Sequence, residues 1–311
     1  MSMSTLRGIF PNTFIIGAPK CGTSALATYI SEHPNVFFST PKEPFFWCSD
    51  FPNIKHEMSL DSLGDYLELF RKADPDMHCV VAEGSTRYLR SSVAINNILE
   101  FNPAAKFIAM VRNPVELVRA YHMEQRYSLH EDLADFEDAW RAQGIRSEGL
   151  QIPRGCREPA FLQYGQVASL GAQIEFASAA IPKDQLLVIV FDDFKSDPAE
   201  VYARTLGFLG LPNDGRAEFP VVNSAHGHRA EWLARLVLTP PAFLERPMLK
   251  ARRHLWERRY PPIELVKGWL NRKQSRPEIS PNLLLELKNY FREDVQRLGR
   301  AIHRDLSEWT R

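Results

Sequence analysis

The residues of this chain whose types and spacing most clearly suggest chemistry lie at positions 17–24, in the sequence GAPKCGTS. Two glycines bound the segment, a lysine lies inside it, and a threonine and a serine follow the second glycine. The lysine supplies positive charge, and the hydroxyls can donate to anion oxygens. A helix beginning here would add backbone amides that have no partner inside the helix. The segment therefore predicts a site for a phosphate-like anion.

The spacing nearly matches the phosphate-binding loop G-x-x-x-x-G-K-[ST] of nucleotide-binding proteins. Gly17 and Gly22 have the right separation and Ser24 takes the place of the last hydroxyl, but Thr23 replaces the lysine, which has moved to Lys20. The alternative interpretation is an ordinary turn with a solvated lysine. We favour anion binding because an apolar strand pattern precedes the segment and a helical pattern follows it.

A second anion site is predicted at Arg112. This arginine ends the apolar run at 106–111 and precedes Asn113-Pro114, a sequence typical of a helix start. An arginine fork beside a helix N-terminus suits a phosphate group. The alternative is an arginine paired with a neighbouring acid.

Glu43 is a candidate general base. Two prolines enclose Lys42 and Glu43 in a stiff segment, and three aromatic residues follow. A carboxylate held on a rigid loop beside aromatic side chains can accept a proton from a reacting group. Taken alone, however, the segment favours a surface pair of Lys42 and Glu43.

The four cysteines have no close paired spacing, so we expect free thiols in a reducing compartment. Cys21 lies within the anion segment, where a thiol pKa can be lowered. We favour the simpler interpretation that Cys21 is a small loop residue.

Strand and helix patterns alternate from 13 to 210, which predicts an α/β fold with a parallel sheet and helices on both faces. Residues 144–159 are expected to form a loop at a substrate edge. The strands are expected at 13–16, 36–38, 78–82, 106–111 and 185–191, and the principal helices at 23–30, 61–71, 92–100, 114–127, 135–142, 161–180, 199–209 and 283–302.

Composition excludes several classes of function. The chain of 311 residues carries 38 basic and 38 acidic side chains, so no overall charge favours nucleic acid. No apolar run is long enough to span a membrane, and the N-terminus lacks the apolar core of a secretory signal. We therefore expect a cytoplasmic protein. No metal-ligand spacing appears.

Together these motifs resemble the sulfotransferases that use 3′-phosphoadenosine 5′-phosphosulfate (PAPS), in particular the heparan-sulfate type. Residues 18–24 resemble the 5′-phosphosulfate loop of that family, and Arg112-Asn113-Pro114 its 3′-phosphate motif. Residues 42–46 are similar to its Glu-bearing segment, and the strand ending at Glu83 to the next motif. Residues 191–198 and the final DLSEW look like bacterial members. The resemblance implies one P-loop-like, three-layer domain over 1–311, with a core at 13–210 and a loop and helical extension at 211–311.

The resemblance also implies roles for individual residues. Lys20 would stabilise the leaving phosphate and Glu43 would deprotonate the acceptor for in-line attack on sulfur, without a metal, giving PAP (adenosine 3′,5′-bisphosphate) as product. The acceptor would be a hydroxyl or amine of a small molecule or a carbohydrate. The residues expected to hold the cofactor are Lys20, Cys21, Gly22, Thr23, Ser24, Arg112 and Arg229, the last from the weaker candidate loop at 226–229.

Two positions depart from the family pattern. Ala120 stands where the 3′-phosphate motif usually has a serine, so that phosphate contact is either missing or supplied elsewhere, for example by Ser128 or Arg126. Gly84 stands where the heparan-type enzymes carry a lysine, which weakens the expectation of a heparan-like acceptor. His122 is an alternative base, although a surface histidine is the expected interpretation.

Two other functions stay open from sequence. A P-loop kinase or NTPase gains from Asp192 and Asp193, which could hold magnesium after a strand, but loses because Thr23 replaces the motif's lysine. A catalytically silent protein that binds PAPS or PAP is the second alternative. The identity of the acceptor and the oligomeric state are not encoded in any motif that we can interpret.

Overall fold

The computed structural model of the chain describes residues 10–55, 60–221, 226–228, 271–273 and 278–311. These residues form two compact units. The first comprises the described residues of Met1–Leu117, Ser169–Asn223 and Lys288–Arg311, and the second those of Val118–Ala168 and Ser224–Leu287.

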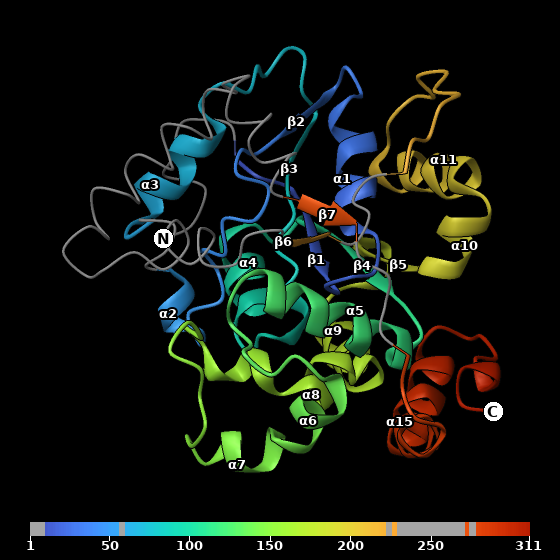
Figure 1. The fold of residues 1–311 in the computed structure, drawn as a ribbon. Coiled ribbons are helices and arrows are strands. Elements are labelled where there is room, and N and C mark those ends of the chain that lie inside the picture. Colours follow the sequence, from blue (N-terminus) through green and yellow to red (C-terminus); the bar gives the residue numbers. More distant parts are fainter. Residues whose placement is uncertain (1–9, 56–59, 222–225, 229–270, 274–277) are drawn as a thin grey trace. The chain divides into compact units, whose positions relative to one another are not determined.

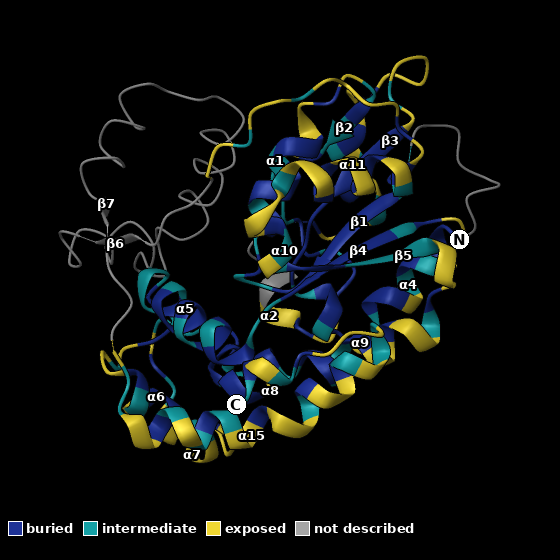
Figure 2. Ribbon diagram, turned by 90° about the vertical axis from the view of Figure 1, so that its right-hand side faces the viewer, coloured by how far each residue is buried: buried dark blue, intermediate teal, exposed yellow. Residues whose placement is uncertain are grey.

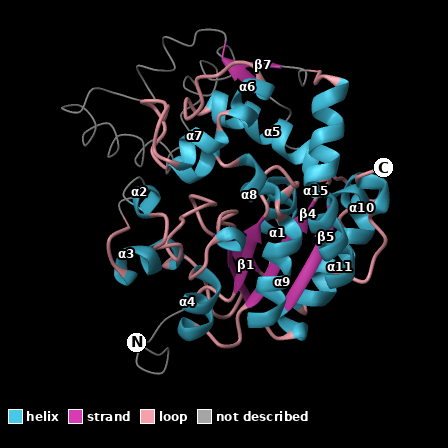
Figure 3. Ribbon diagram, turned by 90° about the horizontal axis from the view of Figure 1, so that it is seen from below, coloured by secondary structure: helices cyan, strands magenta, loops and turns pink. Residues whose placement is uncertain are grey.

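The first unit is built on a five-stranded sheet in the order β2-β3-β1-β4-β5, in which every neighbouring pair is parallel. Its apolar, β-branched strands are those expected from the sequence pattern, and β1 at the centre is buried at every residue. Figures 1 and 3 show β1, β4 and β5 side by side. The strands are β1 (Thr13–Gly17), β2 (Val36–Phe38), β3 (Val80–Glu83), β4 (Lys106–Val111) and β5 (Leu186–Val190).

Helices cover both faces of this sheet, which confirms the three-layer α/β prediction. Figure 2 shows α1 and α11 on one face and α4 and α9 on the other, each with a buried inner side. The helices wholly inside the first unit are α1 (Thr23–Ser31), α2 (Pro52–Lys55), α3 (Leu63–Leu67), α4 (Ala94–Phe101), α9 (Leu170–Ala180), α10 (Phe191–Ser196) and α11 (Pro198–Leu209), with single 3₁₀ turns η3 (Glu68–Phe70), η4 (Tyr88–Arg90), η6 (Lys183–Gln185) and η7 (Ser307–Trp309).

The second unit contains short helices and a two-stranded antiparallel sheet. Its elements are α6 (Phe136–Arg141), α7 (Gln143–Ser147), η5 (Pro159–Leu162), α8 (Tyr164–Ala168), β6 (His226–His228) and β7 (Asn271–Lys273). Two longer helices contain residues of both units: α5 (Pro114–Tyr127) and α15 (Pro281–Ala301).

Several expected elements are wrong in detail. The single helix expected at 161–180 is divided into η5, α8 and α9, because Gln163 and Ser169 have non-helical backbone angles. The loop expected at 144–159 begins as helix α7. The strand expected at 185–191 ends at Val190, and Phe191, Asp192 and Asp193 open helix α10 instead.

Helices long and apolar enough to cross a bilayer do not occur in the part of the chain that the structure describes. The cytoplasmic location expected from sequence stays a prediction.

Candidate active site

The predicted anion loop joins the central strand β1 to helix α1. Gly17 is required by space, since a Cβ atom there would lie 2.7 Å from Cβ of Leu89. Lys20 and Gly22 both have positive φ angles, 61° and 91°, so the loop turns tightly before Thr23 opens the helix. Gly22 is the N-cap and gives no side-chain cap, and the first helical turn has no acidic residue. These features leave the helix N-terminus suited to an anion.

Cys21 does not have the activated thiol considered from sequence. Its side chain is wholly buried, and Sγ contacts the carbonyl oxygen of Pro19 at 3.4 Å. Burial raises the pKa of the Cys21 thiol to about 12, although the charge of Arg112 acts in the opposite direction. Any contribution of Cys21 to an anion site therefore comes from its backbone.

Arg112 lies beside the anion loop because β4 is the neighbour of β1 in the sheet. Its Nη1 donates to the carbonyl oxygen of Lys20 at 3.1 Å, and the guanidinium stacks over the ring of Phe191 at 4.5 Å. Nη2 of Arg112 also lies 3.7 Å from Oε2 of Glu116, so the pairing with a neighbouring acid that sequence left as the alternative is present as well. As expected, Asn113 caps α5 by accepting from the amide of Val115. The structure thus brings Arg112 and Lys20 together.

Glu43 lies close to the same loop, joined to it through Lys42. The Lys42 ammonium donates to Oγ1 of Thr23 at 3.3 Å and to Oε1 of Glu43 at 3.0 Å. The hydroxyl of Thr86 donates to the other carboxylate oxygen at 3.1 Å. Glu43 retains 29% exposure of its side chain. The pair of Lys42 and Glu43 is therefore part of a polar cluster at the anion loop and not an isolated surface pair.

Comparison with known proteins identifies the fold and the class of enzyme. The profile described as "Sulfotransferase domain" matches residues 10–224. The chain belongs to the sulfotransferase family. The crystal structure of a sulfotransferase from Alicyclobacillus acidocaldarius superposes with a TM-score of 0.70 at 26% identity, covering 98% of this chain and 100% of that one. This sulfotransferase is thus a transferase with the expected fold, and the family decides against the kinase alternative.

Relatives among characterised proteins include heparan sulfate enzymes. Human bifunctional heparan sulfate N-deacetylase/N-sulfotransferase 3 is 26% identical over 308 residues, which cover 97% of this chain and 31% of the relative. The type 1 enzyme of Caenorhabditis elegans is 29% identical over 222 residues, covering 70% of this chain and 24% of the relative. The sulfotransferase described here therefore spans less than a third of the length of these relatives.

The buried carboxylate of Glu83 is connected through hydroxyl groups to the segment that carries Glu43. Glu83 ends β3 with no exposed surface and accepts hydroxyl hydrogen bonds from Ser85 (2.6 Å), Tyr88 (2.8 Å) and Tyr66 (3.1 Å). Two of these hydroxyls in turn accept hydrogen bonds from backbone amides of the segment that carries Glu43. The hydroxyl of Ser85 accepts from the amide of Phe45 at 3.0 Å, and the hydroxyl of Tyr88 accepts from the amide of Trp47 at 3.3 Å. Glu83 is thus a scaffold for the loop that carries Glu43.

The charge of Glu83 is held under opposing influences. Burial raises its pKa, and the nearby charge of Glu43 acts in the same direction, whereas the three hydroxyl donors lower it. The result is a pKa raised to about 7. Sequence placed Glu83 at a strand end but gave no sign of this network.

Several candidate residues lie in the second unit. Ala120 is buried in α5, and Arg126 donates to the carbonyl oxygen of Asp132 at 2.6 Å. His122 is only 2% exposed, so the expected surface histidine is wrong; its Nε2 lies 3.0 Å from the carbonyl oxygen of Leu133, and burial lowers its pKa. Arg229 lies outside the described residues.

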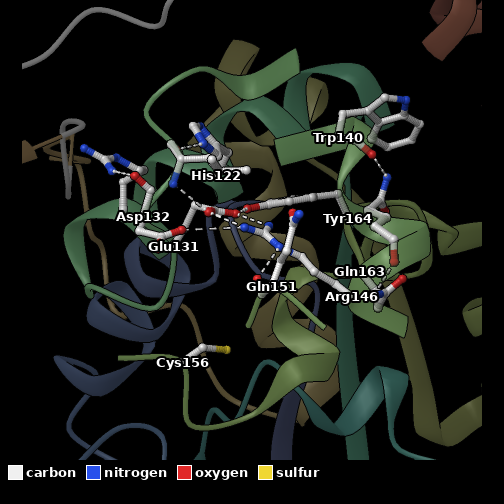
Figure 4. Close-up of polar contacts among 12 residues, drawn as sticks. His122, Glu131, Asp132, Trp140, Arg146, Gln151, Cys156, Gln163 and Tyr164 are labelled. Atoms are coloured by element: carbon white, nitrogen blue, oxygen red, sulfur yellow. Dashed lines mark hydrogen bonds and ion pairs between the residues drawn. The ribbon is translucent and has the colours of Figure 1, made fainter. Parts of the chain in front are cut away.

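The second unit also holds a buried ion pair that sequence analysis missed. Arg146 donates to both carboxylate oxygens of Glu131, at 2.6 and 2.8 Å, and both side chains have at most 1% exposure (Figure 4). The hydroxyl of Tyr164 and the amide of Leu133 complete the bonds to Glu131. Burial acts to raise the pKa of Glu131, but these donors outweigh it and the pKa is lowered. Because both carboxylate oxygens of Glu131 accept hydrogen bonds, we interpret this cluster as structural.

The two aspartates that supported a kinase are engaged elsewhere. Asp193 forms an ion pair with Arg304, and Asp192 accepts from Nε1 of Trp309 at 3.2 Å. Groups of three or more potential metal ligands are also absent among the described residues.

Proposed function

We propose that this sulfotransferase transfers a sulfuryl group from PAPS to a hydroxyl or amine of a small-molecule or carbohydrate acceptor. The observation that carries the proposal is that Arg112 and Glu43 are both joined by polar contacts to the loop that carries Lys20. Arg112 contacts the backbone of Lys20, and Lys42 links Glu43 to Thr23 of the same loop. Two cations and a carboxylate around a tight loop at a helix N-terminus are the groups that such a reaction requires.

The residues present fit PAPS. The loop after β1 turns tightly into the N-terminus of α1, has an N-cap without a side chain and carries a lysine. We assign the 5′-phosphosulfate to Lys20 and the loop from Cys21 to Ser24, and the 3′-phosphate to Arg112. Arg229 is kept as a candidate for the same nucleotide. When bound, PAPS supplies an activated sulfuryl group whose leaving group is PAP.

The protein's own groups would then position the reactants and move one proton. Glu43 accepts the proton of the acceptor hydroxyl or amine, and Lys20 stabilises the negative charge that develops on the leaving phosphate. Thr86 and Lys42 hold the two carboxylate oxygens of Glu43, which fixes the direction of the base. The heparan sulfate named in the relatives supports testing carbohydrate acceptors first.

Calorimetric titration with PAP in the absence of metal tests the cofactor. We expect Lys20→Ala and Arg112→Ala each to weaken binding by about tenfold to a hundredfold, because each loses a charge-assisted contact of roughly 1.5–3 kcal/mol. The matched controls are Lys183→Ala and Arg204→Ala, which are exposed and lie away from the carboxyl ends of the strands. Equal affinity in the four variants would contradict the proposal, as would a preference for ATP with magnesium.

Glu43→Gln distinguishes an enzyme from a silent nucleotide-binding protein. The variant keeps the shape of the side chain but cannot accept a proton, so we expect PAP affinity to stay within threefold while transfer from radiolabelled PAPS falls by about a hundredfold or more. The assay uses a panel of carbohydrates and small molecules with free hydroxyls or amines. Unchanged transfer would remove Glu43 from the mechanism.

A further inference from the structure

Lys42 occupies a position between the anion loop and the candidate base. Its ammonium donates to Thr23 Oγ1 at 3.3 Å and to Glu43 Oε1 at 3.0 Å, and the side chain keeps 23% exposure. These contacts use two of the three donors of an ammonium group. The positive charge of Lys42 therefore contacts both Thr23 of the anion loop and the candidate base Glu43, and it comes from a different segment than Lys20.

Gly84 makes room for this lysine. A Cβ atom at Gly84 would lie 3.1 Å from Cε of Lys42 and 3.4 Å from Cζ of Phe38. The amide of Gly84 also donates to the carbonyl oxygen of Lys42 at 2.9 Å. The aliphatic part of Lys42 thus passes directly over Gly84, and any side chain there would press on the carbon next to the ammonium. A side chain at 84 would therefore require its neighbours to give by a few tenths of an ångström, whereas the backbone conformation would allow it, since Gly84 is not among the positive-φ glycines.

The hydrogen bond from Lys42 to Thr23 also affects the anion-binding capacity of the loop. A hydroxyl that accepts a hydrogen bond from an ammonium becomes a stronger donor through its own proton. Thr23 is the first residue of α1, where backbone amides and the helix dipole favour an anion. The ammonium of Lys42 therefore adds positive charge to the loop from the side on which Glu43 lies.

We propose that Lys42 is a second catalytic cation of the sulfuryl-transfer site and that Gly84 holds open the space through which Lys42 reaches it. The inference rests on the proposed function. Lys42 has two tasks: it holds Glu43 toward the acceptor, and it stabilises the sulfuryl oxygens while the bond from sulfur to the leaving phosphate oxygen breaks and the bond to the acceptor forms. The proton goes from the acceptor to Glu43.

Release of inorganic sulfate from PAPS, with water as the acceptor, tests this role without a known acceptor, and PAP titration measures nucleotide binding in parallel. For Lys42→Met, which keeps the aliphatic chain, we expect sulfate release to fall by about tenfold to a hundredfold, the loss of one charge-assisted contact. PAP affinity is expected to stay within threefold. Gly84→Ala should lower release in the same direction by displacing the ammonium, and Lys183→Met is the matched control.

The double variant Lys42→Ala/Gly84→Lys separates a chemical role from a structural one. The Cβ atom of a lysine at 84 would lie 3.1 Å from the Cε position of Lys42, and the four bonds from this Cβ to Nζ are long enough to bring an ammonium into the same region. If Lys42 acts through its charge, we expect the double variant to release sulfate at least fivefold faster than Lys42→Ala alone. If Lys42 acts only through a structural contact, the lysine at 84 does not restore that contact and the rate stays that of Lys42→Ala. Each variant is first checked for an unfolding midpoint near that of the natural chain.

The outcomes are distinguishable. If the natural chain neither binds PAP nor releases sulfate, the proposed function fails. If the natural chain is active and Lys42→Met releases sulfate at the same rate, only the role of Lys42 fails. A loss of PAP affinity as large as the loss of rate would also overturn that role, because Lys42 would then hold the nucleotide uniformly. A double variant no faster than Lys42→Ala overturns the chemical role of the Lys42 charge, and a Gly84→Ala variant as fast as the natural chain overturns the role given to Gly84.

Discussion

At the scale of single residues, two carboxylates near the anion loop have opposite environments. Glu43 is part-exposed, with one oxygen held by Lys42 and the other by Thr86. Glu83 has no exposed surface, and its partners are neutral hydroxyls. A base must exchange protons with a substrate, so Glu43 is the residue suited to that task. Glu83 holds the loop in place.

The raised pKa of Glu83 predicts a pH-dependent stability. Its pKa is about 7 in the folded chain against an ordinary value of 4.5, so the folded state binds more protons between those values. The resulting stabilisation is present below pH 4.5 and is lost as the pH rises through about 7. In the natural chain, the contribution of Glu83 to the unfolding free energy should therefore fall as the pH rises from 4.5 to 7. We expect this fall to be absent in Glu83→Gln, as measured by urea denaturation at several pH values. Glu68→Gln, an exposed carboxylate, is the control, and parallel curves for Glu83→Gln and the natural chain would contradict the prediction.

Sequence could identify the residues of the candidate site whose chemistry is local. Lys20 and Glu43 lie in short motifs, and Arg112 follows its strand directly, so type and spacing point to them. Glu83 could not be singled out, because its role comes from hydroxyls on Tyr66 and Tyr88 that only the fold brings to it. The departure at Gly84 likewise has a physical reason only once the path of the Lys42 side chain is known.

At the scale of elements, the parallel sheet was predictable because each strand is an apolar run between loops. The break before α9 was not. Its first amides, those of Gly171 and Ala172, bond to the carboxylate of Asp294, which is more than 120 residues away in sequence. Gly171 also lets α15 approach, since a Cβ there would lie 2.1 Å from the carbonyl oxygen of Asp294. Such distant caps override local helical periodicity.

The ion pair of α7 makes the strongest prediction at this scale. Arg146→Met leaves Glu131 buried without its charged partner, which costs roughly 3–5 kcal/mol for a buried pair. We expect amide hydrogen exchange to speed up across 131–165, measured by mass spectrometry. Arg141→Met removes an exposed pair with Glu286 and is expected to leave exchange there nearly unchanged. Equal effects of the two variants would show that the buried pair does not hold this element.

At the scale of the whole molecule, the contact map separates two units, whereas sequence predicts one domain over 1–311. Two of the four boundaries fall inside helices: Leu117 and Val118 are consecutive residues of α5, and Leu287 and Lys288 are consecutive residues of α15. A helix forms cooperatively, so unfolding one unit would interrupt hydrogen-bonded turns that also belong to the other. We therefore propose that the two units unfold together as one domain.

Ligand linkage tests this proposal. The described residues that we assign to PAP, from Lys20 to Ser24 and Arg112, all belong to the first unit. PAP at a hundred times its dissociation constant stabilises whatever unfolds with its site by about 2.7 kcal/mol. In a single domain, the slowest-exchanging amides of the second unit, within 118–168, should gain this protection as fully as those of β1 and β4. Lys20→Ala at the same PAP concentration should gain much less. Protection confined to the first unit would mean that the chain unfolds as two domains, because the second would then open without releasing the nucleotide.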